Sequence, residues 1–387
     1  MEILETIAVP RPNGSDEFYQ TAAFIKEWLT EQGLSVGAHL FSMRPYFFEI
    51  VAATIIVAVL LFVYLAFFRK SWLAMVPVLL VGLVMLFEAS LGTPVVSGLI
   101  RRDAENIVVT ITPERPEQEL ILTAHYDSKT QPFDHQQREL IFQLIIPSVI
   151  AGALLALLWW LLHRRGRQPA RTFSLPLGGL LALLPLYWLL LALTFGGGFM
   201  AKPSPGAVDN GTAVAVLMEL SKELKETPLE KTAVTIVLFA AEELNAQGSQ
   251  AYLRDHPRGE AIPAYNVNLE LVAQEGDYVY WPEDGVFTNR YPTSAELNRI
   301  LGEALSRVTG EEIGPLEASF TTISDSGSFL AAGIPSTTLG NAGSPELGCS
   351  FFHSYLDNME RVVPERIDEM VQILKEFTLL FDTTPMG

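Results

Sequence analysis

Residues 232–243 read TAVTIVLFAAEE, and this stretch decides the fold. The nearly continuous apolar run of residues 232–240 predicts a strand buried on both faces, as at the centre of a parallel sheet. The acids that follow, Glu242 and Glu243, are costly to bury unless a partner neutralises them. Neighbours at a strand end point opposite ways, so one acid can bind a cation while the other faces a substrate. A solvated turn is the alternative interpretation.

Strand-like and helix-like patterns alternate along the chain on both sides of this stretch. This alternation predicts an α/β fold with a mixed, largely parallel sheet and helices on both faces. The predicted strands are residues 106–111, 120–124, 232–240, 265–272 and 334–339. The predicted helices begin at the N-cap Ser15, continue with residues 210–226, 246–255, 294–308 and 326–332, and end with a helix that Pro364 opens.

Composition narrows the function classes. The 387 residues carry a formal net charge of −18, with the excess acid outside the most apolar segments. Nothing resembles a basic patch, so we expect no nucleic-acid partner. The single Cys349 excludes an internal disulfide and a cysteine-rich metal site.

Four apolar segments have the length of a bilayer crossing: residues 46–68, 72–91, 140–162 and 174–195. Aromatic residues near their ends suit the interfaces of a membrane. We therefore predict four transmembrane helices arranged as two hairpins in an integral membrane protein. Buried core helices are the alternative.

Removing the hairpins divides the chain into five parts. Hairpins at 46–91 and 140–195 interrupt one globular domain that is built from residues 1–45, 92–139 and 196–387. Residues 1–36 have a helix pattern and not that of a signal peptide. The short loops inside the hairpins are basic, and the positive-inside rule makes them cytoplasmic. The globular domain is then expected outside the cytoplasm. The basic residues are Arg69, Lys70, Arg164, Arg165, Arg167 and Arg171.

Residues with metal-binding side chains follow the predicted strands. His125 and Asp127 follow the strand at 120–124, and Glu270 lies in the apolar run 265–272. Open α/β sheets place their sites at the carboxyl ends of strands, so these residues should converge with Glu242 and Glu243. A carboxylate beside a ligating imidazole fixes its tautomer, which gives Asp127 a rationale. Alternatively, His125 and Asp127 form an ion pair in a loop, and Glu270 faces the surface from an edge strand.

Two further candidates lie outside strands. Asp209 precedes the helix at 210–226, where a carboxylate can bridge two cations or simply cap the helix. His353 lies among aromatic residues, where a core or loop histidine is the commoner role. His353 is a candidate ligand only because the other metal-binding motifs are present in the same chain.

These motifs resemble the co-catalytic di-zinc aminopeptidase family (clan MH), which also contains glutamate carboxypeptidases and glutaminyl cyclases. The resemblance covers the chain outside the hairpins, from PRPNGS at residues 10–15 to FHSYLDNMERV at 352–362. It implies two Zn²⁺ ions per chain and peptide hydrolysis. It makes Glu242 the general base and Asp127 the residue that orients a ligand. The implied zinc ligands are His125, Asp209, Glu243, Glu270 and His353, with Asp209 bridging.

The chain departs from the family pattern at two positions. Glu270 stands where the family most often has Asp, and Ser326 stands where it usually has His. Three alternatives to an aminopeptidase remain: a glutaminyl cyclase-like acyltransferase, a non-catalytic membrane scaffold, and a transporter. The first resembles a one-zinc version of the fold. The last is disfavoured because the apolar segments offer no polar pathway at their middle.

Spacing in the sequence also bears on the substrate. Asp127 lies 13 residues before Leu140, and Asp209 lies 14 residues after Phe195. The site is therefore expected close to the membrane surface. We expect peptide substrates that are apolar or membrane-proximal, and the sequence leaves the oligomeric state open.

Overall fold

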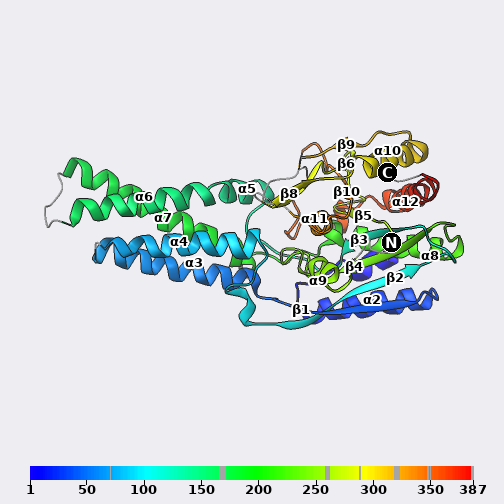
Figure 1. Ribbon diagram of the computed structural model, residues 1–387, viewed down its shortest axis with the longest axis horizontal. Coiled ribbons are helices and arrows are strands. Elements are labelled where there is room, and N and C mark those ends of the chain that lie inside the picture. The colour runs from blue at the N-terminus through cyan, green and yellow to red at the C-terminus, as the bar shows by residue number, and fades with distance from the viewer. Residues whose placement is uncertain are drawn as a thin grey trace. The chain divides into compact units, whose positions relative to one another are not determined.

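The computed structural model describes residues 1–69, 71–164, 171–257, 262–286, 289–317, 323–346, 348 and 350–384. Within these ranges, the side chains of residues 89, 90 and 171–174 are not described. The chain forms two compact units (Figure 1). The first comprises Met1–Pro45, Arg101–Thr130 and Lys202–Gly387, and the second comprises Tyr46–Ile100 and Gln131–Ala201.

An eight-stranded mixed sheet forms the centre of the first unit, in the order β1-β2-β4-β3-β5-β10-β6-β9. The inner strands β4, β3, β5 and β10 are parallel to one another. The pairs β1–β2, β2–β4 and β10–β6 are antiparallel, and β6 pairs parallel with β9. The strands are β1 Val36–Met43, β2 Arg102–Ile111, β3 Gln118–His125, β4 Thr232–Phe239, β5 Ala264–Leu269, β6 Tyr278–Tyr280, β9 Gly314–Pro315 and β10 Ser336–Asn341. A separate hairpin joins β7 Glu283–Val286 to β8 Asn289–Pro292.

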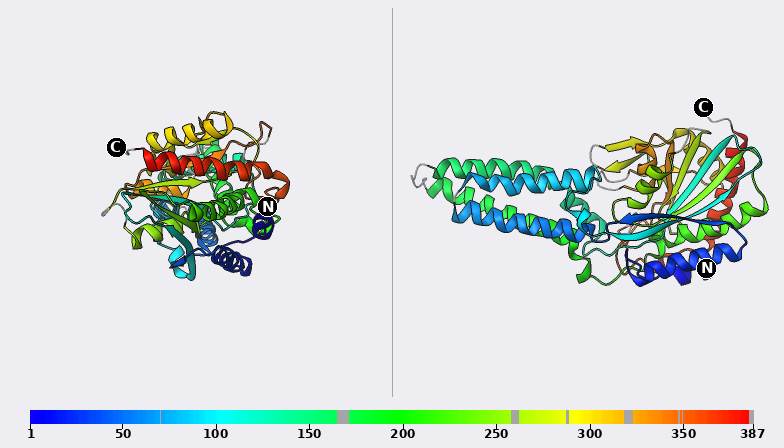
Figure 2. Two further views of the ribbon diagram at one scale, coloured as in Figure 1. Left: turned by 90° about the vertical axis from the view of Figure 1, so that its right-hand side faces the viewer. Right: turned by 60° about the horizontal axis from the view of Figure 1, so that its bottom comes forward.

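Helices surround this sheet in the first unit. They are α1 Glu2–Ile7, α2 Asp16–Glu31, α8 Thr212–Glu226, α9 Gln247–Asp255, α10 Ala295–Thr309, α11 Asp325–Ala331 and α12 Pro364–Thr383, with short turns at η6 Ala207–Gly211 and η7 Met359–Arg361. Ser15 caps α2 by accepting a hydrogen bond from the backbone N–H of Phe18. The left-hand view of Figure 2 shows α10 and α12 side by side.

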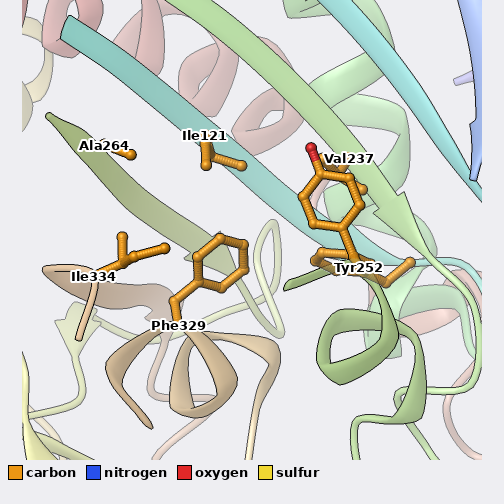
Figure 3. Close-up of a cluster of buried hydrophobic side chains, with 7 residues drawn as sticks. Ile121, Val237, Tyr252, Ala264, Phe329 and Ile334 are labelled. Carbon is orange, nitrogen blue, oxygen red and sulfur yellow. The ribbon is translucent and has the colours of Figure 1, made fainter. Parts of the chain in front are cut away.

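Buried side chains explain why the inner strands are so apolar. Tyr252 of α9 and Phe329 of α11 pack with Ile121 and Val237 on one face of the sheet (Figure 3). Leu120 and Leu122 alternate with Ile121 along β3 and are also fully buried, so both faces of this strand are covered. Helix α8 contacts β2, β3 and β4. The predicted α/β class, with a largely parallel sheet between helices, is confirmed.

The inner strands lie where the sequence predicts them, and the edges differ. Strand β1 and the short strands β6 to β9 were not predicted, because their sequences lack a sustained apolar run. Strand β5 ends at Leu269, three residues before its predicted end. Leu271 has a left-handed backbone with φ of 54°, which a strand cannot include. Glu270 therefore directly follows the strand.

The second unit is helical. It contains α3 Phe47–Val63, η1 Tyr64–Phe68, η2 Trp72–Ala74, α4 Met75–Val84, η3 Met85–Ser90, η4 Ser97–Leu99, α5 His135–Gln143, α6 Ile145–His163, α7 Arg171–Gly196 and η5 Gly197–Met200. Among the described residues, three helical stretches are long and apolar enough to cross a membrane: Phe47–Phe68, His135–His163 and Leu175–Met200. The fourth predicted span is the shorter apolar helix Trp72–Glu88.

Packing in the second unit differs from that of a soluble bundle. Trp188 is fully buried and donates a hydrogen bond to the Ser148 hydroxyl at 3.2 Å. A Cβ atom on Gly152 would lie 2.6 Å from Leu184, so this glycine lets two helices approach closely. Leu154 and Leu183 are more than half exposed. Small residues inside and large apolar residues outside are typical of helices in lipid, which suggests membrane association.

The predicted orientation and the four-span count remain predictions. Lys70, Arg165 and Arg167, which contribute to the basic loops, lie outside the described residues, as does Cys349. The domain boundaries at residues 139 and 195 likewise remain predictions.

Candidate metal centre

The candidate ligands meet at the carboxyl ends of the inner parallel strands. His125 is the last residue of β3, and Glu270 directly follows β5. Glu242 and Glu243 follow β4 after a two-residue turn. Asp209 lies in η6 before α8, and His353 lies in the segment between β10 and α12. The structure therefore brings together every residue that the sequence nominated.

Two groups of three candidate ligands share one carboxylate. His125, Asp209 and Glu270 form the first group, and Asp209, Glu243 and His353 form the second. Within each group the ligand atoms lie within 4.8 Å of one another. Nε2 of His125 lies 3.2 Å from Asp209 Oδ1 and 3.5 Å from Glu270 Oε2. Nε2 of His353 lies 3.2 Å from Asp209 Oδ2 and 2.9 Å from Glu243 Oε1.

Asp127 connects the first imidazole to the glutamate pair. Nδ1 of His125 faces the Asp127 backbone carbonyl at 3.2 Å and its Oδ1 atom at 3.3 Å. A proton on Nδ1 is held there, which leaves Nε2 free to bind a cation. The Asp127 carboxylate also accepts hydrogen bonds from the backbone N–H groups of Glu242 and Glu243 and from the Asn13 amide.

Backbone conformation around the ligands is strained. Ala241, Leu271 and His353 have φ values of 58°, 54° and 62°. Residues with a side chain rarely adopt this region, which costs on the order of 1–3 kcal/mol each. Each of the three is a candidate ligand or adjoins one. Such strain clusters at functional sites, where the surrounding structure imposes the geometry that the site needs.

The donor set fits divalent zinc. The two groups offer only imidazole nitrogen and carboxylate oxygen, which Zn²⁺ binds readily. Among the described residues, buried Glu243 Oε1 receives no hydrogen bond, although His353 Nε2 lies 2.9 Å away. A carboxylate oxygen and an imidazole nitrogen that face each other without hydrogen-bond geometry are placed like two ligands of one cation.

The electrostatics also favour a bound cation. Burial raises the pKa of Glu242 well above its usual value; the nearby His125 opposes this shift, and the negative charges of Glu270 and Glu243 add to it. Burial likewise raises the pKa of Glu270. Burial acts in the same sense on Asp209, but hydrogen bonds from His125 and His353 outweigh it and hold its pKa well below the usual range. So many carboxylates in one dry site need positive charge to stay ionised.

Glu242 differs from the ligand groups in its surroundings. Its Oε2 atom lies 3.8 Å from His125 Nε2, farther than either carboxylate of the first group. It belongs to neither group of three. A carboxylate beside a metal centre that does not bind the metal is placed to exchange a proton with what the metal binds.

The two departures from the family pattern have different outcomes. The Glu270 carboxylate reaches His125, and the Asn268 amide orients it by donating to Oε1 at 3.1 Å. Ser326 is fully buried, and its hydroxyl donates to Asp284 and accepts from Thr338. That network occupies the Ser326 hydroxyl.

Three buried charged residues of the site were not assigned by the sequence. The Asp357 carboxylate accepts from the backbone N–H groups of Val208 and Asp209, at 2.8 and 3.3 Å. Burial raises the pKa of Asp325 to about 8. Arg11 is fully buried among backbone carbonyls. Arg11 and Asp357 lie inside the two motifs that carry the family resemblance, and their charge there was the available signal. Asp325 adjoins Ser326, where the chain departs from the family pattern.

Comparison with known proteins shows that part of the chain is similar to peptidases. Residues 194–378 match the family model described as "Peptidase family M28". "Aminopeptidase YwaD" of Bacillus subtilis (strain 168) is 30% identical over 177 residues, which are 43% of this chain and 35% of the relative. The alignment thus spans about a third of the length of that curated relative.

Solved structures share the fold at low sequence identity. The glutaminyl cyclase of Fimbriiglobus ruber is 13% identical, with a TM-score of 0.56 over 98% of this chain and 94% of that chain. An aminopeptidase from Aneurinibacillus sp. strain AM-1 is 13% identical, with a TM-score of 0.55 over 97% and 92%. The resemblance expected from the sequence is confirmed: residues 194–378 are similar to the peptidases of family M28.

Proposed function

We propose that the chain is a membrane-bound di-zinc metallopeptidase, and specifically an aminopeptidase. The observation that carries this proposal is the pair of three-residue groups that share Asp209. A single shared carboxylate between two otherwise complete groups is the arrangement that two neighbouring cations need. The match of residues 194–378 to the model of peptidase family M28 supports hydrolysis of a peptide bond.

The residues divide into two zinc sites. His125, Asp209 and Glu270 would hold the first ion, and Asp209, Glu243 and His353 would hold the second. Bound zinc would supply a Lewis acid for the scissile carbonyl and would lower the pKa of water. The Asp127 carboxylate keeps the His125 ring in the orientation that presents Nε2 to the site.

Glu242 is the proposed general base. Its carboxylate takes a proton from the attacking water and delivers it to the amine that leaves. Burial raises the pKa of Glu242, so its carboxylate binds a proton more readily than an exposed glutamate does. A general base works best when its pKa lies near the working pH, which supports the assignment.

The named relative supports an aminopeptidase in particular. The matched relative is called an aminopeptidase, and aminopeptidases are among the solved structures that share the fold. A glutaminyl cyclase is the second candidate, because several solved structures with the same fold are glutaminyl cyclases. Two complete ligand groups favour the peptidase, since glutaminyl cyclases resemble a version of this fold that binds one zinc ion.

Removal and return of zinc tests this proposal. Dialysis against a chelator should abolish hydrolysis of leucine p-nitroanilide, because the bound zinc would supply the Lewis acid and lower the pKa of the attacking water. Two equivalents of Zn²⁺ should restore it. A glutaminyl peptide, assayed for ammonia release, is the matched substrate for the cyclase. Ammonia release without hydrolysis of the anilide would favour the cyclase.

The proposal extends to the membrane and the substrate. Three apolar helices of sufficient length support membrane association, and the basic loops favour a catalytic domain outside the cytoplasm. The short sequence spacing between the ligands and the apolar segments supports apolar or membrane-derived peptides as substrates. In proteoliposomes we expect an apolar peptide to be cleaved several-fold faster than a hydrophilic peptide of equal length.

Two controls sharpen that experiment. The Glu242→Gln protein in the same liposomes gives the background hydrolysis. The same peptide pair in detergent removes the bilayer while keeping the site. Equal rates for the two peptides in both preparations would contradict the proposed substrate class without affecting the peptidase assignment. Intact cells should hydrolyse a membrane-impermeant substrate if the domain faces outward.

A further inference from the structure

Arg11 is fully buried, with a relative exposure of 0%. It lies in the PRPNGS motif at residues 10–15, to which the proposed mechanism gives no role. Among the described residues, no carboxylate forms an ion pair with it; its donors face backbone carbonyls instead. A buried guanidinium that is not paired with an acid needs another reason to be there.

The guanidinium joins three segments of the chain. Nε donates to the Tyr126 carbonyl at 2.6 Å. Nη1 donates to Pro205 at 2.6 Å, and Nη2 donates to Gly206 at 2.9 Å. Nη1 also lies 2.9 Å from the Ile7 carbonyl and 3.2 Å from the Val9 carbonyl of its own segment.

Two of these segments carry candidate ligands. Tyr126 lies between His125 and Asp127, and Gly206 lies three residues before Asp209. The hydrogen bonds of Arg11 therefore fix the distance between the strand end that carries His125 and the turn that carries the shared Asp209. A further hydrogen bond strengthens the same junction: the backbone N–H of Arg11 donates to the Ser128 hydroxyl at 2.9 Å.

The junction is tightly packed. Gly206 has φ of 62°, and a Cβ atom there would lie 2.7 Å from the Asp209 carbonyl and 3.0 Å from Arg11 Nη1. Asp357 holds the following N–H groups, those of Val208 and Asp209, through its carboxylate. The Asp209 turn is thus held by Arg11 at its start and by Asp357 at its end.

The charge of Arg11 also acts on the site. Burial lowers its pKa, while the nearby Asp357, Asp127, Asp209 and Glu243 favour its charged form. A guanidinium stays protonated in proteins and offers five N–H donors in a fixed plane. A lysine would supply the same charge but only three donors from one point. The two properties can therefore be separated by experiment.

We propose that Arg11 is a positioning residue for the metal centre: it locks the Tyr126 and Pro205–Gly206 backbone together so that Asp209 lies between His125 and His353. This inference rests on the proposed zinc-dependent function. The competing explanation is that Arg11 only anchors the N-terminal segment and contributes stability without affecting the metal sites.

Zinc affinity of the full-length protein separates these explanations. Arg11→Lys should weaken zinc binding at least tenfold in a competition titration with a chromogenic chelator. Visible absorption of the Co²⁺-loaded protein should change as well, because a shifted Asp209 alters the ligand geometry. Ile25→Ala is the matched control: Ile25 is fully buried in α2 of the same N-terminal region, and its side chain has no group that can hydrogen-bond a ligand segment.

The outcomes are distinct. The control should lower the melting temperature of the metal-free protein by at least as much as Arg11→Lys, yet keep wild-type zinc affinity and the wild-type Co²⁺ spectrum. Wild-type zinc binding in Arg11→Lys, or equal weakening in both variants, would overturn the inference alone. A wild-type chain that binds no zinc would overturn the inference together with the proposed function.

Discussion

Replacing Glu242 by glutamine should lower kcat for peptide hydrolysis by about 10²–10⁴-fold, the range that general acid–base catalysis contributes. Glutamine has the same shape but cannot accept the proton of the attacking water. Glu242 belongs to neither ligand group, so the variant should keep the zinc content of the wild type. Steady-state kinetics with metal analysis on the same samples measures both quantities.

Glu243→Gln is the matched control for this prediction. Glu243 is the next residue of the same turn, and both backbone N–H groups bind Asp127, so the two variants disturb the fold alike. The difference lies in the ligand role: Glu243 Oε1 lies 2.9 Å from His353 Nε2. Glu243→Gln should therefore lose zinc as well as activity. Full activity in Glu242→Gln would remove the general base from the account.

Asp209→Asn should abolish activity by weakening both metal sites at once. Its two carboxylate oxygens face different imidazoles, with Oδ1 3.2 Å from His125 Nε2 and Oδ2 3.2 Å from His353 Nε2. An amide offers one neutral oxygen in place of two charged ones, so one ion loses a ligand and the other loses its charge partner. We expect the zinc content to fall below one ion per chain.

Variants of the unshared ligands provide the comparison. Glu270→Gln changes only the first group and His353→Ala only the second, so each should retain about one zinc ion. Metal analysis after gel filtration distinguishes the three variants. Two retained ions in Asp209→Asn, or complete loss in both comparison variants, would contradict a bridging role for Asp209.

The inner sheet and the ligands could be predicted because burial on two faces leaves a clear pattern. Thr232–Phe239 is apolar at nearly every position, and every residue of this strand is buried. Strands buried on both faces are typical of the centre of a largely parallel sheet, where the carboxyl ends of the parallel strands meet at one edge. That reasoning placed His125, Glu242 and Glu270 together, although each residue alone had a common structural explanation.

The edges of the sheet could not be predicted for the converse reason. Strand β1 has an alternating exposed and buried pattern that includes His39 and Ser42, and β6 to β9 are two to four residues long. Short edge strands depend on their neighbours and not on local sequence. The role of Arg11 was equally hidden, because its acceptors are backbone carbonyls up to 195 residues away.

The helical unit shows a limit of a different kind. Apolar composition predicted four spans, and three of the described helical stretches are long and apolar enough to cross a membrane. Glu88 lies in η3, near the end of the remaining apolar helix, and its buried carboxylate accepts from the backbone N–H groups of Val95, Val96 and Ser97. Hydropathy alone does not register such a contact, in which an acid near the end of an apolar helix binds the backbone that follows it.

Anomalous diffraction at the zinc edge from crystals of the wild-type protein tests the central claim most directly. Two peaks are expected: one contacted by His125, Asp209 and Glu270, and the other by Asp209, Glu243 and His353, with Asp209 common to both. A single peak, or a peak whose contacts exclude Asp209, would contradict a two-metal centre built on a shared carboxylate.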